Sequence, residues 1–458
     1  MNAPSRARVA ALIAGLEAGL LERSAAARLV LLAALAGEHV LLIGPPGTAK
    51  SELARRLHRC FAGSPFFERL LTRFTTPEEL FGPLSLKALE DDRYERLVDG
   101  YLPRAGIAFL DEVFKANSAI LNALLTLLNE REFDNGPTRE RTPLVSVVGA
   151  SNEVPGEEAL LAFFDRFLVR VPVSGVGEAS FGALLTLAPA APPAVEPVSP
   201  QELRGWLAAR EAVVLGADSI EALHALRRAA AAQGIVVSDR RWRQLVGLLR
   251  SAAFLEGRTQ VEPLDLWLVP YVIAAQPAQV PALQDWFVCE AAQAEPQDAP
   301  WLTRAVEAFE KQLELEATLP ADDGDDAAGK LALARAVGGS AEGGLLRIVS
   351  ATLEQQLRRR WSPVHVAARL AQLDELIGRA GAPLPGLRAA LAALEAALAK
   401  RLWLPPELAQ QLRANRQATL ATLEALLDRL AAVRAGFAAL PQDEQLPATV
   451  PEPVALGA

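Results

Sequence analysis

Apolar and polar positions alternate in two different ways along this chain. In the first 38 residues the apolar positions recur at helical spacing, and we expect two helices there, with one face made by Val9, Ile13, Leu16 and Leu20. Short apolar runs then alternate with helical stretches, and they predict strands at 41–43, 70–74, 107–110, 144–150 and 168–173. Such alternation favours a largely parallel sheet covered by helices, with functional residues at the carboxyl ends of the strands.

The second half of the chain is predicted to be helical. It is separated from the first half by a stretch dense in proline and alanine, which cannot form regular structure. Acidic and glycine-containing loops interrupt the helical pattern further on, and the last residues are rich in proline. The pattern predicts an α/β domain at 1–188, a linker at 189–200, an all-helical domain at 201–276, a helical extension at 277–440 with flexible loops near 317–345, and a disordered tail at 441–458.

Leucines recur every three or four residues on both sides of the turn at Pro405-Pro406. They run from Leu387 to Leu402 and again from Leu420 to Leu430. This spacing predicts an antiparallel helical hairpin with coiled-coil-like seams. The stripe fits the core of an ordinary helical bundle and a docking surface for a partner equally well.

Composition and charge exclude several classes of protein. Hydrophobic residues make up 51% of the 458 residues and charged residues 22%, a globular balance. We find neither a signal peptide nor an apolar run near the roughly 20 residues that span a bilayer, so we expect a cytoplasmic protein. The net charge of -9 argues against sequence-independent binding of nucleic acid. Cys60 and Cys289 are too isolated to imply a disulfide framework or a zinc site.

The apolar run at 41–43 breaks into a glycine-rich turn that ends in Lys50 and Ser51. Backbone N–H groups of such a turn, followed by a helix N-terminus, bind phosphate, while the lysine supplies an ammonium and the serine a hydroxyl for Mg²⁺. Ala49 stands where the usual pattern has its second glycine, which is tolerated if residue 49 has helical backbone angles. The segment predicts a site for ATP and Mg²⁺ made by Gly44, Pro45, Pro46, Gly47, Thr48, Ala49, Lys50 and Ser51.

Polar residues end the two strands that are predicted at 107–110 and 144–150. Asp111 would hold Mg²⁺ through its water shell, and Glu112 would polarise the attacking water as a general base. Asn152 would bridge the γ-phosphate and this water, because an amide donates and accepts without adding charge. Together with the phosphate-binding turn, these residues predict hydrolysis of a nucleoside triphosphate.

Arg166 follows two phenylalanines just before the last predicted strand. An arginine that projects from a helix end can reach the γ-phosphate of a neighbouring subunit, and such residues contribute about 10³–10⁵ in rate. This role would require oligomerisation. Arg170 is the alternative, although its position within a strand leaves it less free, and a surface ion pair would explain Arg166 equally simply.

At this point the chain resembles a known family, the AAA+ ATPases of the MoxR group and, within it, the RavA-like branch. Alanine before the lysine is a familiar variant in this group. The similarity runs from about residue 10 to residue 275, and its motifs are Gly44–Ser51, Thr75–Leu84, Arg93–Leu97, Leu110–Glu112 and Val237–Trp242.

The resemblance implies further roles. Arg240, or alternatively Arg241, would be the lid sensor that reaches the γ-phosphate of its own subunit. Residues Ser85–Leu102 resemble a hairpin that lies near a central pore, with a simple surface hairpin as the alternative, and Arg131–Gly136 resembles the hairpin inserted before the first sensor. RavA-like proteins also carry a small β-containing domain, but residues 317–385 lack strand alternation here.

We therefore expect an α/β AAA+ core with an all-helical lid and a C-terminal helical-bundle extension, assembled into a ring, as a hexamer. The resemblance implies Mg²⁺-dependent ATP hydrolysis that remodels a protein client in a chaperone-like way, together with a von Willebrand factor A (vWA) domain partner. One alternative is a nucleotide-gated scaffold with little turnover. A DNA-translocating motor is a third hypothesis, disfavoured by the acidic charge.

Overall fold

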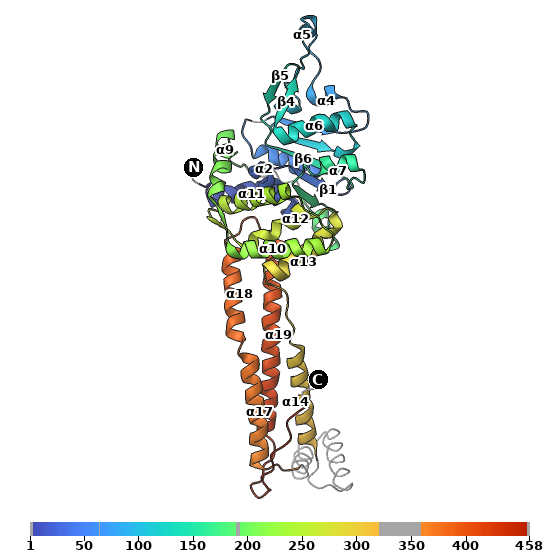
Figure 1. Ribbon diagram of the computed structural model, residues 1–458. Helices are drawn as coiled ribbons and strands as arrows, with labels where there is room; N and C mark the ends of the chain where they lie inside the picture. Colours follow the sequence, from blue (N-terminus) through green and yellow to red (C-terminus); the bar gives the residue numbers. More distant parts are fainter. Residues whose placement is uncertain (1–2, 64, 189–192, 320–358, 456–458) are drawn as a thin grey trace. The chain divides into compact units, whose positions relative to one another are not determined.

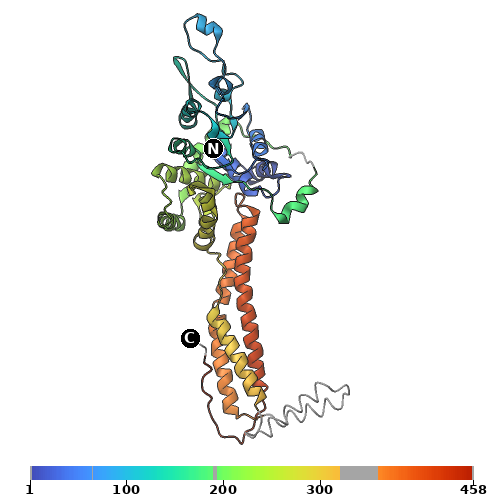
Figure 2. The same ribbon diagram turned by 90° about the vertical axis from the view of Figure 1, so that its right-hand side faces the viewer.

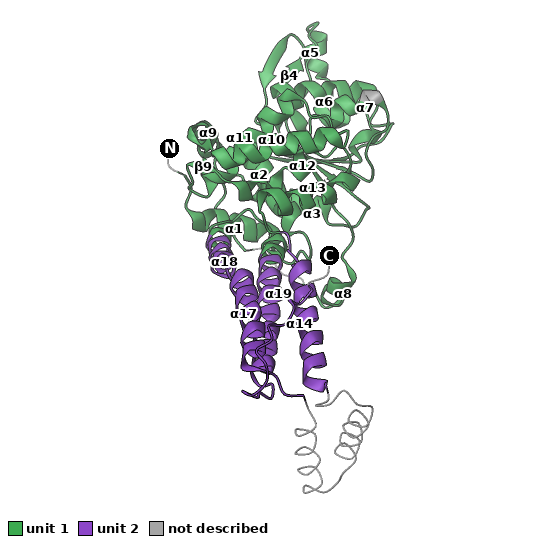
Figure 3. Cartoon of the chain, turned by 60° about the horizontal axis from the view of Figure 1, so that its bottom comes forward, with its two compact units in different colours: residues 1–294, 397–412 green, residues 295–396, 413–458 purple. Residues whose placement is uncertain are grey.

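The computed structural model describes residues 3–63, 65–188, 193–319 and 359–455 (Figure 1). The chain divides into two compact units (Figure 3). Unit 1 contains residues 1–294 and 397–412, and unit 2 contains residues 295–396 and 413–458. Most of the predicted flexible loops near 317–345, and residues 189–192 of the predicted linker, lie outside the described residues.

Unit 1 is built on a five-stranded sheet in the order β2-β3-β6-β1-β7, and all four strand pairs are parallel. The predicted α/β fold is confirmed. Strand β1 lies between β6 and β7, so the turn that follows β1 starts between the ends of its two neighbours. The strands are β1 Val40–Ile43, β2 Phe66–Leu70, β3 Ile107–Asp111, β6 Ser146–Ser151 and β7 Val169–Pro172.

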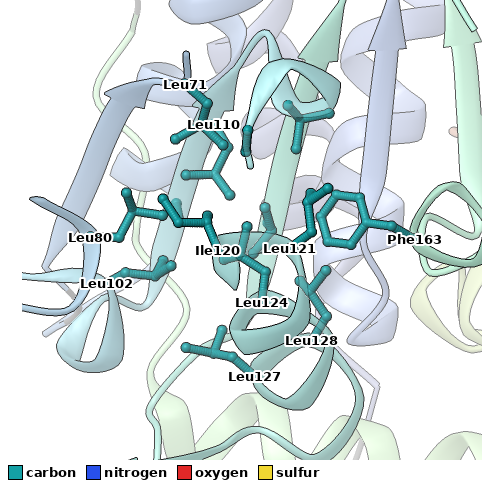
Figure 4. Close-up of a cluster of buried hydrophobic side chains, with 14 of the residues drawn as sticks. Leu71, Leu80, Leu102, Leu110, Ile120, Leu121, Leu124, Leu127, Leu128 and Phe163 are labelled. Carbon is teal, nitrogen blue, oxygen red and sulfur yellow. The ribbon is translucent and has the colours of Figure 1, made fainter. Parts of the chain in front are cut away.

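Helices cover this sheet (Figure 1), and β1 and β6 are buried along their whole length. In one part of the core the leucines of α6 pack with Leu80 of α4 and Phe163 of α7 (Figure 4). Each such buried side chain contributes about 1.5–3 kcal/mol relative to exposure. The helices of unit 1 are α1 Arg6–Glu17, α2 Ser24–Ala36, α3 Lys50–Arg59, α4 Pro77–Phe81, α5 Leu86–Glu90, α6 Ser118–Glu130, α7 Glu158–Phe164, α8 Glu178–Leu185, α9 Pro200–Ala209, α10 Ala217–Ala232, α11 Asp239–Leu255, α12 Pro270–Ile273 and α13 Val280–Trp286.

One predicted strand is out of place. The strand expected at 70–74 is wrong, because β2 ends at Leu70. After Leu71 the chain enters a turn in which the backbone N–H of Thr72 donates to the hydroxyl of Thr75 at 2.9 Å. A threonine that caps a turn competes with strand pairing, and this local bond ends the strand.

Two inserted segments contact each other. The hairpin predicted from Asn135-Gly136 is confirmed as β4 Glu132–Asn135 and β5 Thr138–Arg141. The Asn135 carboxamide accepts from the backbone of Arg96 at 2.7 Å and donates to it at 3.2 Å. A Cβ on Gly136 would lie 1.8 Å from the carbonyl oxygen of Tyr94, so only glycine allows this approach. The predicted hairpin at 85–102 contains the short helix α5 between its paired arms.

The all-helical region predicted at 201–276 contains α9 to α12 and a single pair of two-residue strands, β8 Val214–Leu215 and β9 Gln260–Val261. The predicted boundary at 276 is wrong. Unit 1 continues to residue 294 through α13 and a π-helix, Phe287–Ala291, because Val280, Leu283 and Phe287 are buried within it.

Unit 2 is a bundle of α14 Pro300–Thr318, α17 Pro363–Gly381 and most of α18 Leu384–Ala399 and α19 Pro406–Ala438 (Figure 2). The predicted antiparallel hairpin is confirmed: Asp374 pairs with Arg434 and Arg388 pairs with Glu424, each at 2.6 Å. Leucines of α17 and α19 form one buried core with Phe309 of α14. The leucine stripe is therefore, in this part, the core of a bundle.

The C-terminal tail is described as far as residue 455, and its predicted disorder is wrong for those residues. The backbone N–H of Asp443 donates to the carbonyl oxygen of Trp361 at 3.0 Å, and Arg369 donates to that of Glu452 at 2.7 Å. Val454 packs against the core of unit 2. Prolines exclude regular structure from such a segment, but they do not prevent side-chain and backbone contacts with a bundle.

Within the described residues, one continuous helix, 363–399, is long and apolar enough to cross a membrane by length and composition alone. It consists of α17 and α18. Its charged residues Asp374 and Arg388 form the ion pairs with α19, and Leu373 and Leu376 are buried in the bundle core.

Candidate active site

The predicted phosphate-binding turn connects β1 to α3. The backbone N–H of Gly44 donates to the carbonyl oxygen of Ser151 at 2.9 Å, which fixes the start of the turn at the end of β6. A Cβ on Gly44 would lie 1.9 Å from the carbonyl oxygen of Val173, so the close approach of β7 requires glycine. Gly47 has a φ of +77° and no atom within 4 Å of where its Cβ would stand, which leaves the inside of the turn open.

Ala49 has a left-handed backbone, with φ 66° and ψ 23°. The condition set from the sequence, that residue 49 is already in a right-handed helical conformation, is therefore wrong. An L-residue in the left-handed region costs roughly 1–2 kcal/mol. Residue 49 thus has the left-handed backbone that suits the second glycine of the usual pattern. The alanine at this position is therefore strained.

Replacement of Ala49 by glycine is expected to raise the free energy of unfolding by about 0.5–1 kcal/mol. The relief of the left-handed strain, about 1–2 kcal/mol, outweighs the extra freedom of glycine in the unfolded chain, about 0.4–1 kcal/mol. The matched control is Ala222→Gly within α10, which should lose about 0.5–1 kcal/mol. Urea denaturation measures both, and an equal loss in the two variants would show that Ala49 is unstrained.

Lys50 is the first residue of α3 and is only 7% exposed. Its ammonium donates to the carbonyl oxygens of Gly44 at 2.6 Å and Pro45 at 2.8 Å. Burial lowers the pKa of Lys50, and the nearby carboxylates of Asp111 and Glu112 oppose this change. The predicted lysine and the two predicted acids thus share one site, with Ser51 in the next position of the same helix.

Glu112 is held by two side chains. Its Oε1 accepts from the Asn152 carboxamide at 2.6 Å, and its Oε2 lies 3.3 Å from the Lys115 ammonium. Asp111 Oδ1 accepts the backbone N–H of Glu112 at 3.0 Å, and Glu112 has a left-handed φ of 51°. The carboxyl ends of β3 and β6 therefore meet, as the sequence predicts. The contact of Lys115 with Glu112 was not predicted, because a lysine three residues after an acid is common on surface turns.

The donor set fits Mg²⁺. In the described part of the chain, no group of three or more His, Cys, Asp or Glu side chains could hold a metal by itself. The available protein donors are the Ser51 hydroxyl and the Asp111 carboxylate, which are hard oxygen ligands. Mg²⁺ is typically bound by one or two such ligands together with substrate phosphates and water, so these residues suit a metal that arrives with a nucleotide.

Arg23 supports the turn from outside and was also missed by the sequence analysis. Its guanidinium donates to the carbonyl oxygens of Thr48 at 3.1 Å and Ser174 at 2.5 Å, and burial lowers its pKa. It stands just before the predicted second helix, with no motif around it. Beside it lies a cavity of about 250 Å³, which we define as the base cavity, lined mainly by apolar residues that include Ala25, Ala26, Val171, Val173, Tyr271 and Val280.

The two candidate trans arginines lie in different environments. Arg170 is buried, stacks on Phe164 with its guanidinium carbon 3.8 Å from the ring centre, and donates to the carbonyl oxygen of Ala274. Burial, with repulsion from Arg241, lowers the pKa of Arg170 to about 8. Arg166 is half-buried, and its Nε, like that of Arg170, has no hydrogen-bond partner among the described residues. Because Arg170 is buried, Arg166 is favoured as the arginine whose side chain can extend from the surface toward a neighbouring subunit.

Arg241 is a structural residue. It is 4% exposed and donates to the Asp165 carboxylate at 2.8 Å and to the carbonyl oxygens of Phe167 at 2.9 Å and Leu168 at 2.7 Å. These bonds tie α11 to the start of β7. Of the two candidates for the lid sensor, Arg240 is therefore favoured over Arg241, because the Arg241 guanidinium already donates to these groups of its own chain.

Arg240 is exposed and donates to the Asn129 carboxamide at 3.3 Å. Burial raises the pKa of Glu38, which precedes β1, to about 7, and Arg240 is the weakest of the groups that oppose this change. Six extended residues from Glu38 to Gly44 span about 20 Å, so Arg240 lies near the amino end of β1 and the phosphate-binding turn at the opposite end. In this arrangement Arg240 lies far from the turn, and its assignment as the residue that reaches the γ-phosphate of its own subunit stays a prediction.

Replacement of Arg241 by methionine is expected to lower the free energy of unfolding by about 2–4 kcal/mol, because it removes the donor to the carbonyl oxygens of the buried Phe167 and Leu168. The matched control is Arg240→Met, which removes a single exposed hydrogen bond and should change stability by less than about 0.5 kcal/mol. Chemical denaturation measures both. Equal losses would contradict the assignment of Arg241 as the structural member of the pair.

Comparisons with known proteins agree with this geometry. Residues 7–192 match the family model described as the MoxR domain in the MoxR-vWA-beta-propeller ternary systems, and residues 218–287 match an AAA lid domain. The uncharacterized protein MJ0812 of Methanocaldococcus jannaschii is 42% identical over 264 residues, which cover 56% of this chain and 69% of that protein. The chain belongs to the MoxR family of AAA+ ATPases.

Two further relatives support this membership. The uncharacterized protein MJ0079 of the same organism is 43% identical over 254 residues, or 55% of this chain and 66% of that protein. Protein MoxR of Paracoccus denitrificans is 30% identical over 167 residues, or 35% of this chain and 48% of that protein. The chain thus spans about two thirds of the two archaeal proteins and about half of the third. The predicted MoxR resemblance is confirmed, while the RavA-like branch stays a prediction.

Proposed function

We propose that this MoxR-family protein is a Mg²⁺-dependent ATPase that forms a ring, hydrolyses ATP between neighbouring subunits and uses the resulting motion to remodel a protein partner. One observation carries the proposal. Asn152 contacts Glu112 at 2.6 Å, and Glu112 and Asp111 act on the buried Lys50 of a phosphate-binding turn. This is the set of groups that triphosphate hydrolysis requires.

In the proposed reaction, different residues of the site bind the phosphates, bind the metal and accept the proton. Lys50 exchanges the carbonyl oxygens of the turn for phosphate oxygens, and Ser51 and Asp111 hold Mg²⁺, which neutralises phosphate charge when it is bound. Glu112 takes the proton of the attacking water. Asn152 and Lys115 each contact one Glu112 oxygen, and each oxygen keeps a second lone pair that can accept the proton.

In the proposed ring, arginines of the neighbouring subunit add positive charge near the γ-phosphate of the bound ATP. Arg166 and Arg240 flank the ion pair between Asp165 and Arg241, and we propose that this edge of the subunit faces the neighbouring subunit. In a closed head-to-tail ring the surface of one subunit meets a different surface of the next. We propose that both arginines act there on the nucleotide of the neighbour, in a hexamer.

The proposed partners follow from the family description, which names MoxR, vWA and β-propeller components. We propose a vWA-domain protein as the adaptor and a protein client, with the RavA-like branch and the cytoplasm as further proposals. The segment around α5 would contact the client, since Leu86 is 76% exposed and Tyr94 is half exposed. Exposed apolar side chains of this kind mark contact sites for polypeptides.

The test is phosphate release from ATP by the purified full chain. The proposal predicts turnover that depends on Mg²⁺, stops when EDTA removes the metal, and returns when Mg²⁺ is added in excess. Turnover that persists in EDTA would contradict the assigned metal role. Absence of turnover under all these conditions, with ATP bound, would favour the scaffold alternative.

A further inference from the structure

Residues 397–412, here called the tip segment, join the end of α18 to the start of α19. The tip segment belongs to unit 1, whereas the remainder of both helices belongs to unit 2. Trp403 and Leu404 of the tip segment are buried. The turn of the helical hairpin is therefore part of the compact unit that holds the candidate active site.

The tip segment is bound to the lid by buried charge. Arg401 is 4% exposed and lies 3.2 Å from Asp265 and 3.7 Å from Glu256. Glu256 also accepts the backbone N–H of Leu402 at 2.5 Å. Removing one partner from such a buried network leaves an uncompensated charge, so this anchor is costly to break.

The tip segment is also bound to the N-terminal helices. Arg28 of α2 donates to the carbonyl oxygens of Leu402 and Leu404, and Arg6 of α1 donates to that of Ala399 at 2.9 Å. These bonds run from arginine side chains to backbone oxygens, and the Arg6 bonds are exposed. Water can therefore replace the hydrogen bonds from Arg6 and Arg28 more easily than it can replace the buried ion pairs of Arg401.

A cavity of about 360 Å³ lies where the tip segment, the lid and the N-terminal helices meet, and Pro405 and Leu408 of the tip segment line it. Other lining residues of this cavity also line the base cavity beside the phosphate-binding turn, namely Glu22, Ala25, Tyr271, Pro281 and Gln284. The two cavities therefore share one wall, which lies between the phosphate-binding turn and the tip segment.

We propose that the tip segment is a nucleotide-controlled latch: it moves with the lid when ATP binds, breaks the bonds from Arg6 and Arg28, and so passes the nucleotide state to α18 and α19. The inference rests on the proposed function, because it needs ATP at the phosphate-binding turn. A segment tied to two domains cannot keep both anchors when these domains rotate, since packed contacts switch rather than stretch.

The coupling is reciprocal. If ATP weakens the bonds from Arg6 and Arg28, loss of these bonds must tighten ATP binding by the same factor. We expect Arg28→Ala to lower the Kd for a fluorescent ATP analogue by about fivefold or more, within the usual range of such couplings. Arg6→Ala should act in the same direction with a smaller effect. The matched control is Arg388→Ala, which lies in the same hairpin but outside the tip segment.

Spin-label distances test the movement itself, in the full chain with Cys60 and Cys289 replaced. A label pair at Ala11 and Gln411 should change distance when a non-hydrolysable ATP analogue binds with Mg²⁺, while a pair at Ala282 and Gln411 should not. Binding of the analogue with neither a distance change nor an effect of Arg6→Ala and Arg28→Ala on the Kd would overturn the latch alone. Absence of nucleotide binding by the wild-type chain would overturn the proposed function and the latch with it.

Discussion

Replacement of Glu112 by glutamine is expected to lower the rate of ATP hydrolysis by about 10²–10⁴-fold, the usual contribution of a general base. Glutamine keeps the shape of the side chain and can still meet the Asn152 carboxamide that lies 2.6 Å from Glu112. It cannot take a proton from water. ATP binding should therefore persist, and phosphate release and nucleotide affinity, measured on the same preparation, separate the two effects.

The control for this variant is Glu153→Gln, because Glu153 is an exposed acid next to Asn152. It should keep the wild-type rate. Full activity of Glu112→Gln would remove Glu112 from the mechanism. If Glu112→Gln loses turnover but still supports client function at the wild-type level, the protein acts as a nucleotide-gated scaffold rather than as a motor.

Replacement of Arg166 by alanine is expected to lower turnover by about 10³–10⁵-fold, as loss of an arginine supplied by a neighbour does in other nucleotide hydrolases. Arg166 is half-buried and takes no part in the ion pair between Asp165 and the buried Arg241. The variant should therefore fold, assemble and bind ATP normally. Phosphate release and sizing of the assembly measure the two properties.

The control is Arg55→Ala, which removes an exposed arginine that pairs with Glu68 at 2.9 Å. It should retain turnover. If Arg166→Ala is as active as this control, the arginine that acts in trans must be sought elsewhere, and Arg240 is the next candidate because it is exposed on the same edge.

The site residues that could be predicted from the sequence are those whose position follows from the parallel sheet. Lys50, Asp111 and Asn152 follow three strands, and parallel strands bring their carboxyl ends to one edge. The direct contact between Asn152 and Glu112 follows from the adjacency of β3 and β6. Local motifs and one topological rule were sufficient for this part of the site.

Features that depend on long-range packing could not be predicted. The left-handed backbone of Ala49 is set by the turn as a whole, and Arg23 reaches this turn from a helix entrance that carries no motif. The position of Arg240 depends on how α11 packs. Arg241 fixes this packing through hydrogen bonds to residues more than 70 positions away in the sequence. The tip segment was read as a plain turn because its buried partners are distant in sequence.

The central claim is that each active site takes Glu112 from one subunit and Arg166 from the next. Mixing Glu112→Gln and Arg166→Ala subunits, each nearly inactive alone, tests it most directly. Random mixing in a ring makes about a quarter of the interfaces intact, so the account predicts recovery of about a quarter of the wild-type rate. Mixed assemblies that form but stay as inactive as the separate variants would contradict it.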